Sequence, residues 1–158
     1  MPNTDALRRL WRLDQHFCVV TGASAGIGLA TSQLLLERSA KVLMVARTLD
    51  RLTASADSLS AQFGSHSVFS LSADVSEASG IAKIVEFCQQ QSSGLNILIN
   101  NVGTNIRKPA LEYSDEEYQH IFDTNLRSCF ELCRALHPLM KLQPNASITN
   151  VSSVAGLT

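Results

Sequence analysis

The segment FCVVTGASAGIG, residues Phe17 to Gly28, runs from a short apolar stretch straight into a glycine-rich loop. An apolar strand, a glycine turn and a following helix form the first unit of many parallel α/β sheets. Glycine permits the tight turn and lets the backbone approach a pyrophosphate, which the N–H groups at the start of the helix favour. The alternative is a tight structural turn without a ligand. The residues predicted to bind a dinucleotide here are Gly22, Ala23, Ser24, Ala25, Gly26, Ile27 and Gly28.

The same alternation continues along the chain. Apolar runs predict further strands at 41–46, 68–71, 95–100 and 147–152, and amphipathic runs predict helices at 26–38, 49–63 and 77–91. Thr48 is the expected N-cap of the helix over 49–63, and Ser114 with Glu117 has the spacing of a capping box opening a long helix. Strands alternating with helices predict an α/β fold with a doubly wound, Rossmann-like parallel sheet.

The spacing of apolar residues predicts which face of each helix is buried. Ile27, Ala30 and Leu34 predict the buried face of the helix over 26–38. In the long helix, the spacing of five apolar residues predicts that Asn125 lies on the buried face. These residues are Phe122, Cys129, Leu132, Leu136 and Leu139.

Length and composition narrow the class of protein. The 158 residues predict one domain, 1–158, with 45% apolar and 17% charged residues. A net charge of −1 argues against nucleic acid or an anionic membrane as a partner. No apolar run approaches the ~18 residues of a membrane span, and the start lacks the apolar centre of a secretory signal, so we expect a cytoplasmic protein.

The cysteines have no metal-site spacing. Cys18, Cys88, Cys129 and Cys133 form no CxxC pair, and the histidines do not cluster with them. Buried, reduced thiols are the favoured interpretation, and no metal is expected.

Four motifs in order resemble the short-chain dehydrogenase/reductase family. They are GxxxGxG at 22–28, NNVG at 100–103, TNL at 124–126 and NVSSVAG at 150–156. The stretch NNVGTNIRKPALEYSDEEY is similar to the plant tropinone reductases, and the likeness runs from about Leu10 to Gly156. The resemblance implies an NADP(H)-dependent oxidoreductase that reduces a small, in some members cyclic, ketone to an alcohol. It also implies a homo-oligomer, a dimer or a tetramer.

Arg47 decides the expected cofactor. An NAD-selective site places an acid at the end of the second strand, where this chain has Ala46 followed by Arg47. A guanidinium binds a 2′-phosphate with two hydrogen bonds, and by resemblance a basic residue here marks the NADP-preferring members. Tropinone reductases often carry a second basic residue in the glycine loop, where this chain has Ala25. The alternative is a solvated surface arginine.

The resemblance assigns further cofactor residues after the third and fourth strands. Asp74 is expected to accept a hydrogen bond from the adenine amino group while Val75 packs on the ring; the alternative is a polar turn. Asn101 and Gly103 are expected to line the adenosine ribose side and to tie the central strands together.

The resemblance also assigns two catalytic positions. Ser153, with Ser152 as second choice, is expected to hold the substrate carbonyl oxygen, and Asn125 to bind a water of the proton relay at a distortion of its helix. A structurally satisfied asparagine is the alternative for Asn125. The family's tyrosine and lysine (YxxxK) follow roughly a dozen residues after the serine, and this chain ends at Thr158.

Three functions therefore compete. The first is the oxidoreductase, of which this chain is expected to be the N-terminal part, with a sheet incomplete at the C-terminus. The second is a non-catalytic dinucleotide-binding or interaction fragment. The third is another Rossmann protein such as a methyltransferase, against which the ordered NNVG, TNL and NVSS motifs argue.

Overall fold

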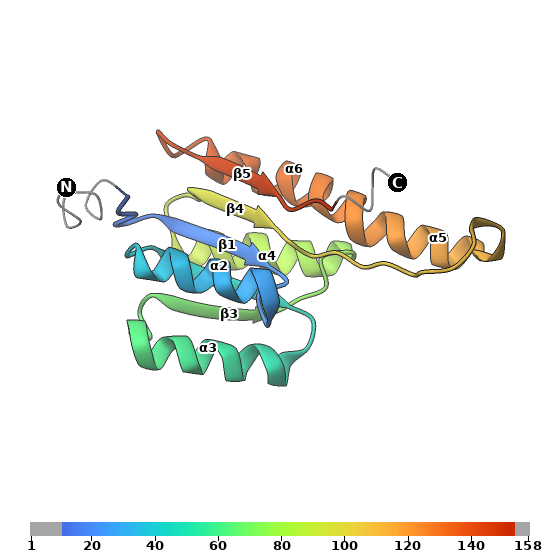
Figure 1. Cartoon of the computed structure of the whole chain (residues 1–158). Helices are drawn as coiled ribbons and strands as arrows, with labels where there is room; N and C mark the ends of the chain where they lie inside the picture. The colour runs from blue at the N-terminus through green and yellow to red at the C-terminus, as the bar shows by residue number, and fades with distance from the viewer. Residues whose placement is uncertain (1–10, 154–158) are drawn as a thin grey trace, which may run out of the picture.

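The fold is an open parallel sheet, described for residues 11–153 by a computed structural model. Five strands lie in the order β3-β2-β1-β4-β5, and every neighbouring pair is parallel. All the strands point the same way, so their carboxyl ends share one edge of the sheet (Figure 1). The strands are β1 (Phe17–Thr21), β2 (Lys41–Ala46), β3 (Val68–Ser72), β4 (Ile97–Asn100) and β5 (Ser147–Asn150).

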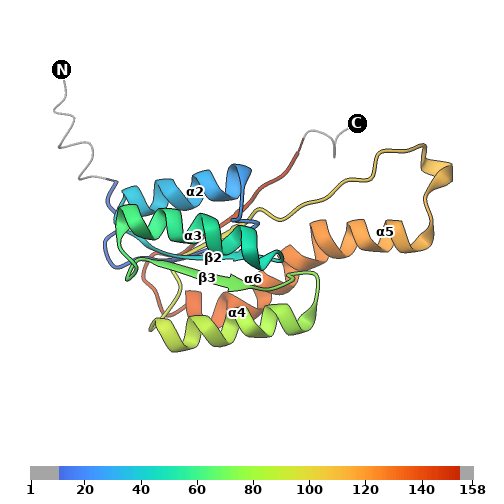
Figure 2. The same cartoon turned by 90° about the horizontal axis from the view of Figure 1, so that it is seen from below.

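Helices cover both faces of this sheet. In Figure 2, α2 and α3 lie on one side of the strands, and α4 and α6 lie on the other. Two further turns belong to the segment between β4 and β5: η1 (Ala110–Glu112) and the π-helical turn η2 (Asp123–Arg127). The α-helices are α2 (Gly26–Glu37), α3 (Leu49–Phe63), α4 (Ala78–Gln91), α5 (Asp115–Phe122) and α6 (Ser128–Met140).

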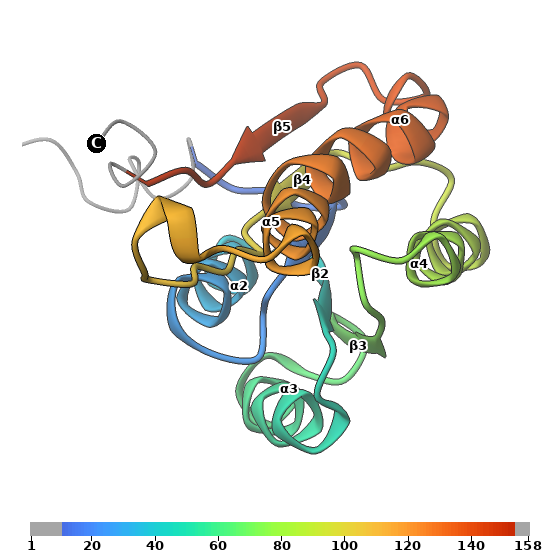
Figure 3. The same ribbon diagram turned by 90° about the vertical axis from the view of Figure 1, so that its right-hand side faces the viewer.

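Two apolar cores follow from the alternation of side chains along each strand. In β1, Val19 points to the core under α4 and α6, while Cys18 and Val20 point to the core under α2 and α3. Figure 3, which looks along the sheet, shows the two helix layers that close these cores. Because both faces are covered, β1 is buried along its whole length and β2 is buried from Val42 to Ala46, and both are mainly apolar, as the sequence predicted.

The predicted elements are confirmed, with shifts of one or two residues at several ends. Ser114 does form the capping box, since its hydroxyl accepts the Glu117 N–H and the Glu117 carboxylate accepts the Ser114 N–H. Thr48 occupies the N-cap of α3, but its side chain makes no capping hydrogen bond. None of the helices within residues 11–153 is long and apolar enough to span a membrane.

The predicted buried face of α2 was wrong. Ile27 and Leu34 are 65% and 53% exposed, and the buried residues are instead Gly28, Ser32 and Leu36. Small residues on this face let the helix lie close to the strands, and the Ser32 hydroxyl is satisfied by donating to the Gly28 carbonyl. Close packing through glycine therefore outweighed the burial of the larger side chains.

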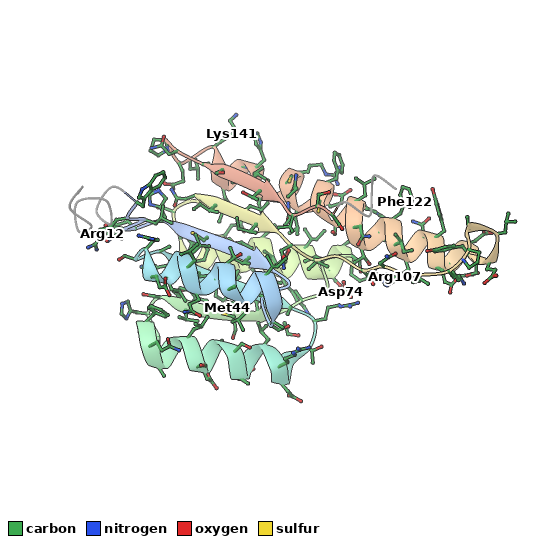
Figure 4. The ribbon with its side chains drawn as sticks, viewed as in Figure 1. Arg12, Met44, Asp74, Arg107, Phe122 and Lys141 are labelled. Atoms are coloured by element: carbon green, nitrogen blue, oxygen red, sulfur yellow. The ribbon has the colours of Figure 1, made fainter. Side chains whose placement is uncertain are left out.

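The prediction that Asn125 is buried was also wrong, although the helix is distorted there as expected. The long helix consists of α5, the π-turn η2 and α6, and Asn125 is exposed in the π-turn. Phe122, labelled at the end of α5 in Figure 4, is exposed to 43%, whereas Leu132 and Leu136 are buried. The extra residue of a π-turn rotates the residues before it away from the face that α6 buries.

Candidate cofactor and active site

A hollow of about 250 Å³ lies at the carboxyl edge of the sheet, where open α/β sheets bind their ligands. Asp74 lies at this end of the sheet in Figure 4. The hollow collects residues from the ends of β1, β2, β3 and β4 and from the π-turn. Its lining residues are Gly22, Ser24, Val45, Ala46, Arg47, Thr48, Ala73, Asp74, Val75, Asn101, Val102, Gly103 and Thr124.

The glycine loop adopts a conformation that requires two of its glycines. Gly22 and Gly26 have φ of +65° and +56°, in the left-handed region that other residues rarely adopt. Gly28 is needed for space instead, since a Cβ there would lie 2.3 Å from the Gly22 carbonyl oxygen. The loop is thus folded tightly against the start of α2, with helix N–H groups at its edge.

Two hydrogen bonds hold the loop from outside. The Ala23 N–H donates to the Val45 carbonyl at 3.1 Å, which fixes the loop to the end of β2. The Ser55 hydroxyl of α3 donates to the Ser24 carbonyl at 3.0 Å. Ala25, the N-cap of α2, provides no side-chain cap. Ser55 therefore ties the loop to the helix that follows Arg47.

Arg47 lies at the end of β2 in the same hollow. Its guanidinium Nη1 is 3.6 Å from Asp74 Oδ2, and its side chain is 59% exposed. The Ser72 hydroxyl donates to the Arg47 carbonyl at 3.0 Å and fixes the backbone from β3. The guanidinium is thus free to turn toward a ligand while its backbone stays in place.

Asp74 is held as an anion beside this arginine. Burial alone would raise the pKa of Asp74, but hydrogen bonds from the Ser76 hydroxyl and N–H, together with Arg47, lower it below its ordinary value. Both Ser76 bonds reach Oδ1, at 2.7 and 2.9 Å. Oδ2 faces Arg47, so it is the oxygen placed to accept from a ligand.

Asn101 joins β4 to the glycine loop. Its Nδ2 donates to the Thr21 carbonyl at 3.0 Å, and its own N–H donates to the Thr21 hydroxyl at 3.0 Å. A Cβ at Gly22 would lie 2.9 Å from the same Nδ2. Asn101 therefore ties the central strands together at the hollow, while Gly103 continues the lining.

Asn125 is bound by the segment that follows β4. Its Oδ1 accepts the Thr104 N–H at 2.7 Å and its Nδ2 donates to the Thr104 carbonyl at 2.8 Å. Gly103 lies next to this pair, since its Cβ would be 3.6 Å from Asn125 Oδ1. The amide thus holds residues 103–104 over the π-turn, which agrees with the alternative of a structurally satisfied asparagine.

Ser152 and Ser153 are exposed and follow β5 at the same carboxyl edge. The segment leading to them is attached to β4, because the Val151 N–H donates to the Asn100 carbonyl and Asn100 Nδ2 donates to Asn150 Oδ1, both at 2.8 Å. The strand order places β5 beyond β4, on the side away from β2. Ser153, which follows β5, and Arg47, which follows β2, are therefore three strands apart along the same edge of the sheet.

Sequence reasoning missed several residues of the site. Thr48 and Thr124 line the hollow, and Thr21 and Ser55 hold its walls. Thr21 precedes the first glycine and Thr124 precedes Asn125, so the motifs themselves pointed to both. Ser55 had no signal, because its role depends on how α3 packs beside the loop.

A larger groove of about 560 Å³ lies elsewhere, between α4 and α6. It shares only Val75 with the residues that line the hollow, and its walls carry both signs of charge, such as Glu86 and Arg134. We favour the smaller hollow as the site because the glycine loop and Arg47 belong to it. Among residues 11–153, no group of three or more His, Cys, Asp or Glu side chains is arranged to hold a metal ion.

The order of the strands, the helices that connect them and the hollow at their carboxyl ends define an open Rossmann-like α/β protein. Comparison with known proteins identifies its family. The family profile described as short chain dehydrogenase matches residues 16–158. The chain therefore belongs to the short-chain dehydrogenase family, and it resembles the tropinone reductases within it.

The named relatives come from plants and bacteria. A tropinone reductase homolog of Arabidopsis thaliana is 42% identical over 151 residues, covering 93% of this chain and 55% of the relative. L-sorbose reductase from Gluconobacter frateurii, solved with NADPH and L-sorbose, has a TM-score of 0.88 at 31% identity, covering 93% of this chain and 56% of that one. An NADPH-bound short chain oxidoreductase from Pseudomonas aeruginosa, described as containing an atypical catalytic center, has a TM-score of 0.85 at 32% identity, covering 92% and 57%. The chain spans about half the length of these relatives.

Proposed function

We propose that residues 1–158 form the NADP(H)-binding part of an oxidoreductase that reduces a small ketone to an alcohol. The observation that carries this proposal is the hollow in which the glycine loop, Arg47 and Asp74 meet. The solved relatives bound to NADPH support the cofactor, and the tropinone reductase homologs support a ketone as substrate.

The residues present fit a dinucleotide. The loop over 22–28 provides a glycine-rich backbone and the N-terminus of a twelve-residue helix for a pyrophosphate. Arg47 would hold a 2′-phosphate, Asp74 Oδ2 would accept from the adenine amino group, and Val75 would pack on the ring. Thr124, which lines the hollow, has a buried hydroxyl with no hydrogen-bond partner among the groups of residues 11–153. Bound NADPH would supply a hydride to a carbonyl carbon.

The chain's own residues would orient the reactants. Ser153 would donate a hydrogen bond to the carbonyl oxygen, and Asn125 would keep residues 103–104 and the π-turn together. The 158 residues contain no YxxxK, the pattern that in this family supplies the proton donor and its lysine. We therefore expect the chain alone to bind the cofactor and to show no appreciable turnover with NADPH and a panel of cyclic ketones. Turnover near the ordinary enzyme range of about 1 s⁻¹ or above would contradict this.

Cofactor titration tests the proposal. Wild type should bind NADPH more tightly than NADH, and Arg47→Ala should lose about 1.5–3 kcal/mol toward NADPH, roughly 10- to 150-fold, with little change toward NADH. Arg134→Ala, an exposed arginine on α6, is the matched control and should change neither affinity. Equal affinities in wild type would refute the NADPH preference.

A homo-oligomer is part of the proposal. Four exposed apolar residues recur at every fourth position along α5, η2 and α6, and we call them the apolar stripe: Tyr118, Phe122, Leu126 and Phe130. Contiguous exposed apolar surface of this kind favours association with another protein surface. The four free thiols support a reducing compartment such as the cytoplasm.

A non-catalytic dinucleotide-binding or interaction fragment remains the second candidate. The observation that favours it is the hollow itself, because the glycine loop and Arg47 could hold a dinucleotide without any YxxxK. Tight NADPH binding without turnover by the 158-residue chain, together with a stop codon directly after Thr158 in the transcript, would favour this function over the enzyme.

A further inference from the structure

Within the part of the chain that the structure describes, no group hydrogen-bonds the hydroxyl of Thr124. The residue is 3% exposed, and within residues 11–153 its Oγ1 is one of two buried side-chain oxygens with no partner. The other, Asn100 Oδ1, belongs to a residue that does not line the hollow. A buried hydroxyl without a partner is unfavourable, so this one requires an explanation.

The π-turn places Thr124 in this position. The Ser128 N–H donates to the Asp123 carbonyl, five residues back, and this widened turn turns Thr124 inward while Asn125 faces residues 103–104. The Thr124 carbonyl is satisfied, because it accepts the Ser128 hydroxyl. Single π-turns inside α-helices occur frequently at functional sites. Within residues 11–153 the side-chain hydroxyl of Thr124 therefore lacks a hydrogen-bond partner, and Thr124 lines the hollow.

The neighbours of Thr124 in the hollow indicate which ligand atoms it would meet. Val102 and Gly103 come from the end of β4, and Asp74 and Val75 come from the end of β3. Asp74 and Val75 are the residues proposed to hold the adenine ring. A hydroxyl can donate to a ring nitrogen or accept from an amino group, so it suits the polar edge of adenine.

We propose that the Thr124 hydroxyl hydrogen-bonds the adenine edge of the dinucleotide, which makes the π-turn a wall of the adenine site. This inference rests on the proposed function, because it needs an adenine dinucleotide in the hollow. It adds a residue that discriminates adenine from apolar rings and that does not touch the 2′-phosphate.

The proposal predicts that removing the hydroxyl leaves the thermal stability of the cofactor-free protein unchanged or raises it, while it lowers the affinity for the dinucleotide. Thr124→Val keeps the shape of the side chain and removes the unpartnered hydroxyl, so the variant without cofactor should melt at the same temperature as wild type or higher. The same variant should bind NADPH and NADH about threefold to tenfold more weakly, by the same factor for both. Thr124→Ser, which keeps the hydroxyl, should bind both within about twofold of wild type.

The experiment measures melting temperature and the affinities for NADPH and NADH of the 158-residue chain. Thr53→Val, an exposed threonine of α3, is the control for the substitution itself. Unchanged affinities in Thr124→Val would overturn the inference, as would a loss confined to NADPH, which would place the hydroxyl at the phosphate. A lower melting temperature without cofactor would show a structural role and would also overturn it. If wild type binds neither dinucleotide, the proposed function fails and this inference fails with it. If wild type binds and Thr124→Val has the same affinities, only this inference fails.

Discussion

Arg47 Nη1 lies 3.6 Å from Asp74 Oδ2, so the residue proposed to bind a phosphate contacts the residue proposed to bind adenine. The two come from neighbouring strands, β2 and β3, whose ends are in register at Ala46 and Ser72. A ligand phosphate that attracts Arg47 would free Asp74 Oδ2 for the adenine amino group. Binding of the two ends of the adenosine moiety is therefore expected to be coupled.

The first prediction concerns the pH dependence of stability at this pair. Because the folded protein lowers the pKa of Asp74, the carboxylate stabilises the fold above its unfolded pKa of about 3.9, and this contribution is lost as pH falls through the folded pKa. Wild type should be more stable than Asp74→Asn near pH 7, and the difference should shrink as pH falls below about 4. The difference should be small, since exposed ion pairs contribute about 0–1 kcal/mol.

Urea unfolding at several pH values between 3 and 7 measures this difference. Asp57→Asn, at an exposed aspartate on α3, is the control for replacing a surface aspartate by asparagine. A difference between wild type and Asp74→Asn that grows on acidification would contradict the expected sign.

The second prediction separates two reasons for glycine in the loop. Gly26→Ala meets no atom within 4 Å and costs only the strain of its positive φ, about 1–2 kcal/mol. Gly28→Ala places a Cβ 2.3 Å from the Gly22 carbonyl oxygen, so α2 must move away from the loop. Thermal melting should therefore show a larger loss for Gly28→Ala, and NADPH titration should show weaker binding. Equal losses in the two variants would mean that contact between Gly28 and Gly22 is not limiting.

The third prediction concerns thiol reactivity. Burial raises the pKa of Cys18 and of Cys88 to about 12, so both should resist a thiol reagent at pH 8 in the native protein. Cys129 and Cys133 are half-buried and should react first, although burial also raises the pKa of Cys129. The number of thiols that react with the reagent, measured in native protein and in urea, tests this prediction. A Cys129→Ser, Cys133→Ser double variant should react only when unfolded, and fast native reaction of that variant would be inconsistent with the buried pair.

The fourth prediction concerns the apolar stripe. If copies of the chain associate through it, Phe130→Glu should shift the protein toward monomer, because a charge would be buried in the contact. Leu34→Glu is a matched control, since Leu34 is similarly exposed on α2, away from the stripe. Sedimentation analysis over a range of concentrations measures both variants. Wild type that stays monomeric throughout, or a shift of equal size in the control, would rule out this face.

The strands and helices could be predicted because each is marked locally. A buried parallel strand is apolar along its whole length, and glycine, Thr48 or Ser114 marks where the next element begins. The positions of Arg47, Asp74 and the glycine loop followed from the same markers, since parallel strands end at one edge. The individual contacts of these residues could not be predicted from local sequence markers, because they depend on how the elements pack.

The errors concerned the faces of helices. In α2, large apolar residues predicted burial, yet Gly28 and Ser32 form the packed face because small side chains permit closer approach. In the long helix, regular spacing predicted that Asn125 is buried, but the π-turn changes the phase at that residue. The unpartnered hydroxyl of Thr124 arises from the same turn, and no periodicity in the sequence reveals it.

The position of β1 at the centre of the sheet has a consequence for synthesis on the ribosome. Residues up to Ser72 complete β1, β2 and β3, which pair side by side, but the other edge of β1 is completed only by β4, which starts at Ile97. At about 5–20 residues per second, translating the intervening stretch takes roughly one to five seconds. During this time the edge of β1 that later pairs with β4 has unpaired backbone N–H and C=O groups, so the nascent chain is vulnerable to mispairing with another chain until β4 emerges. A chaperone that holds this intermediate should therefore act between completion of β3 and the emergence of β4, rather than at release of the finished chain.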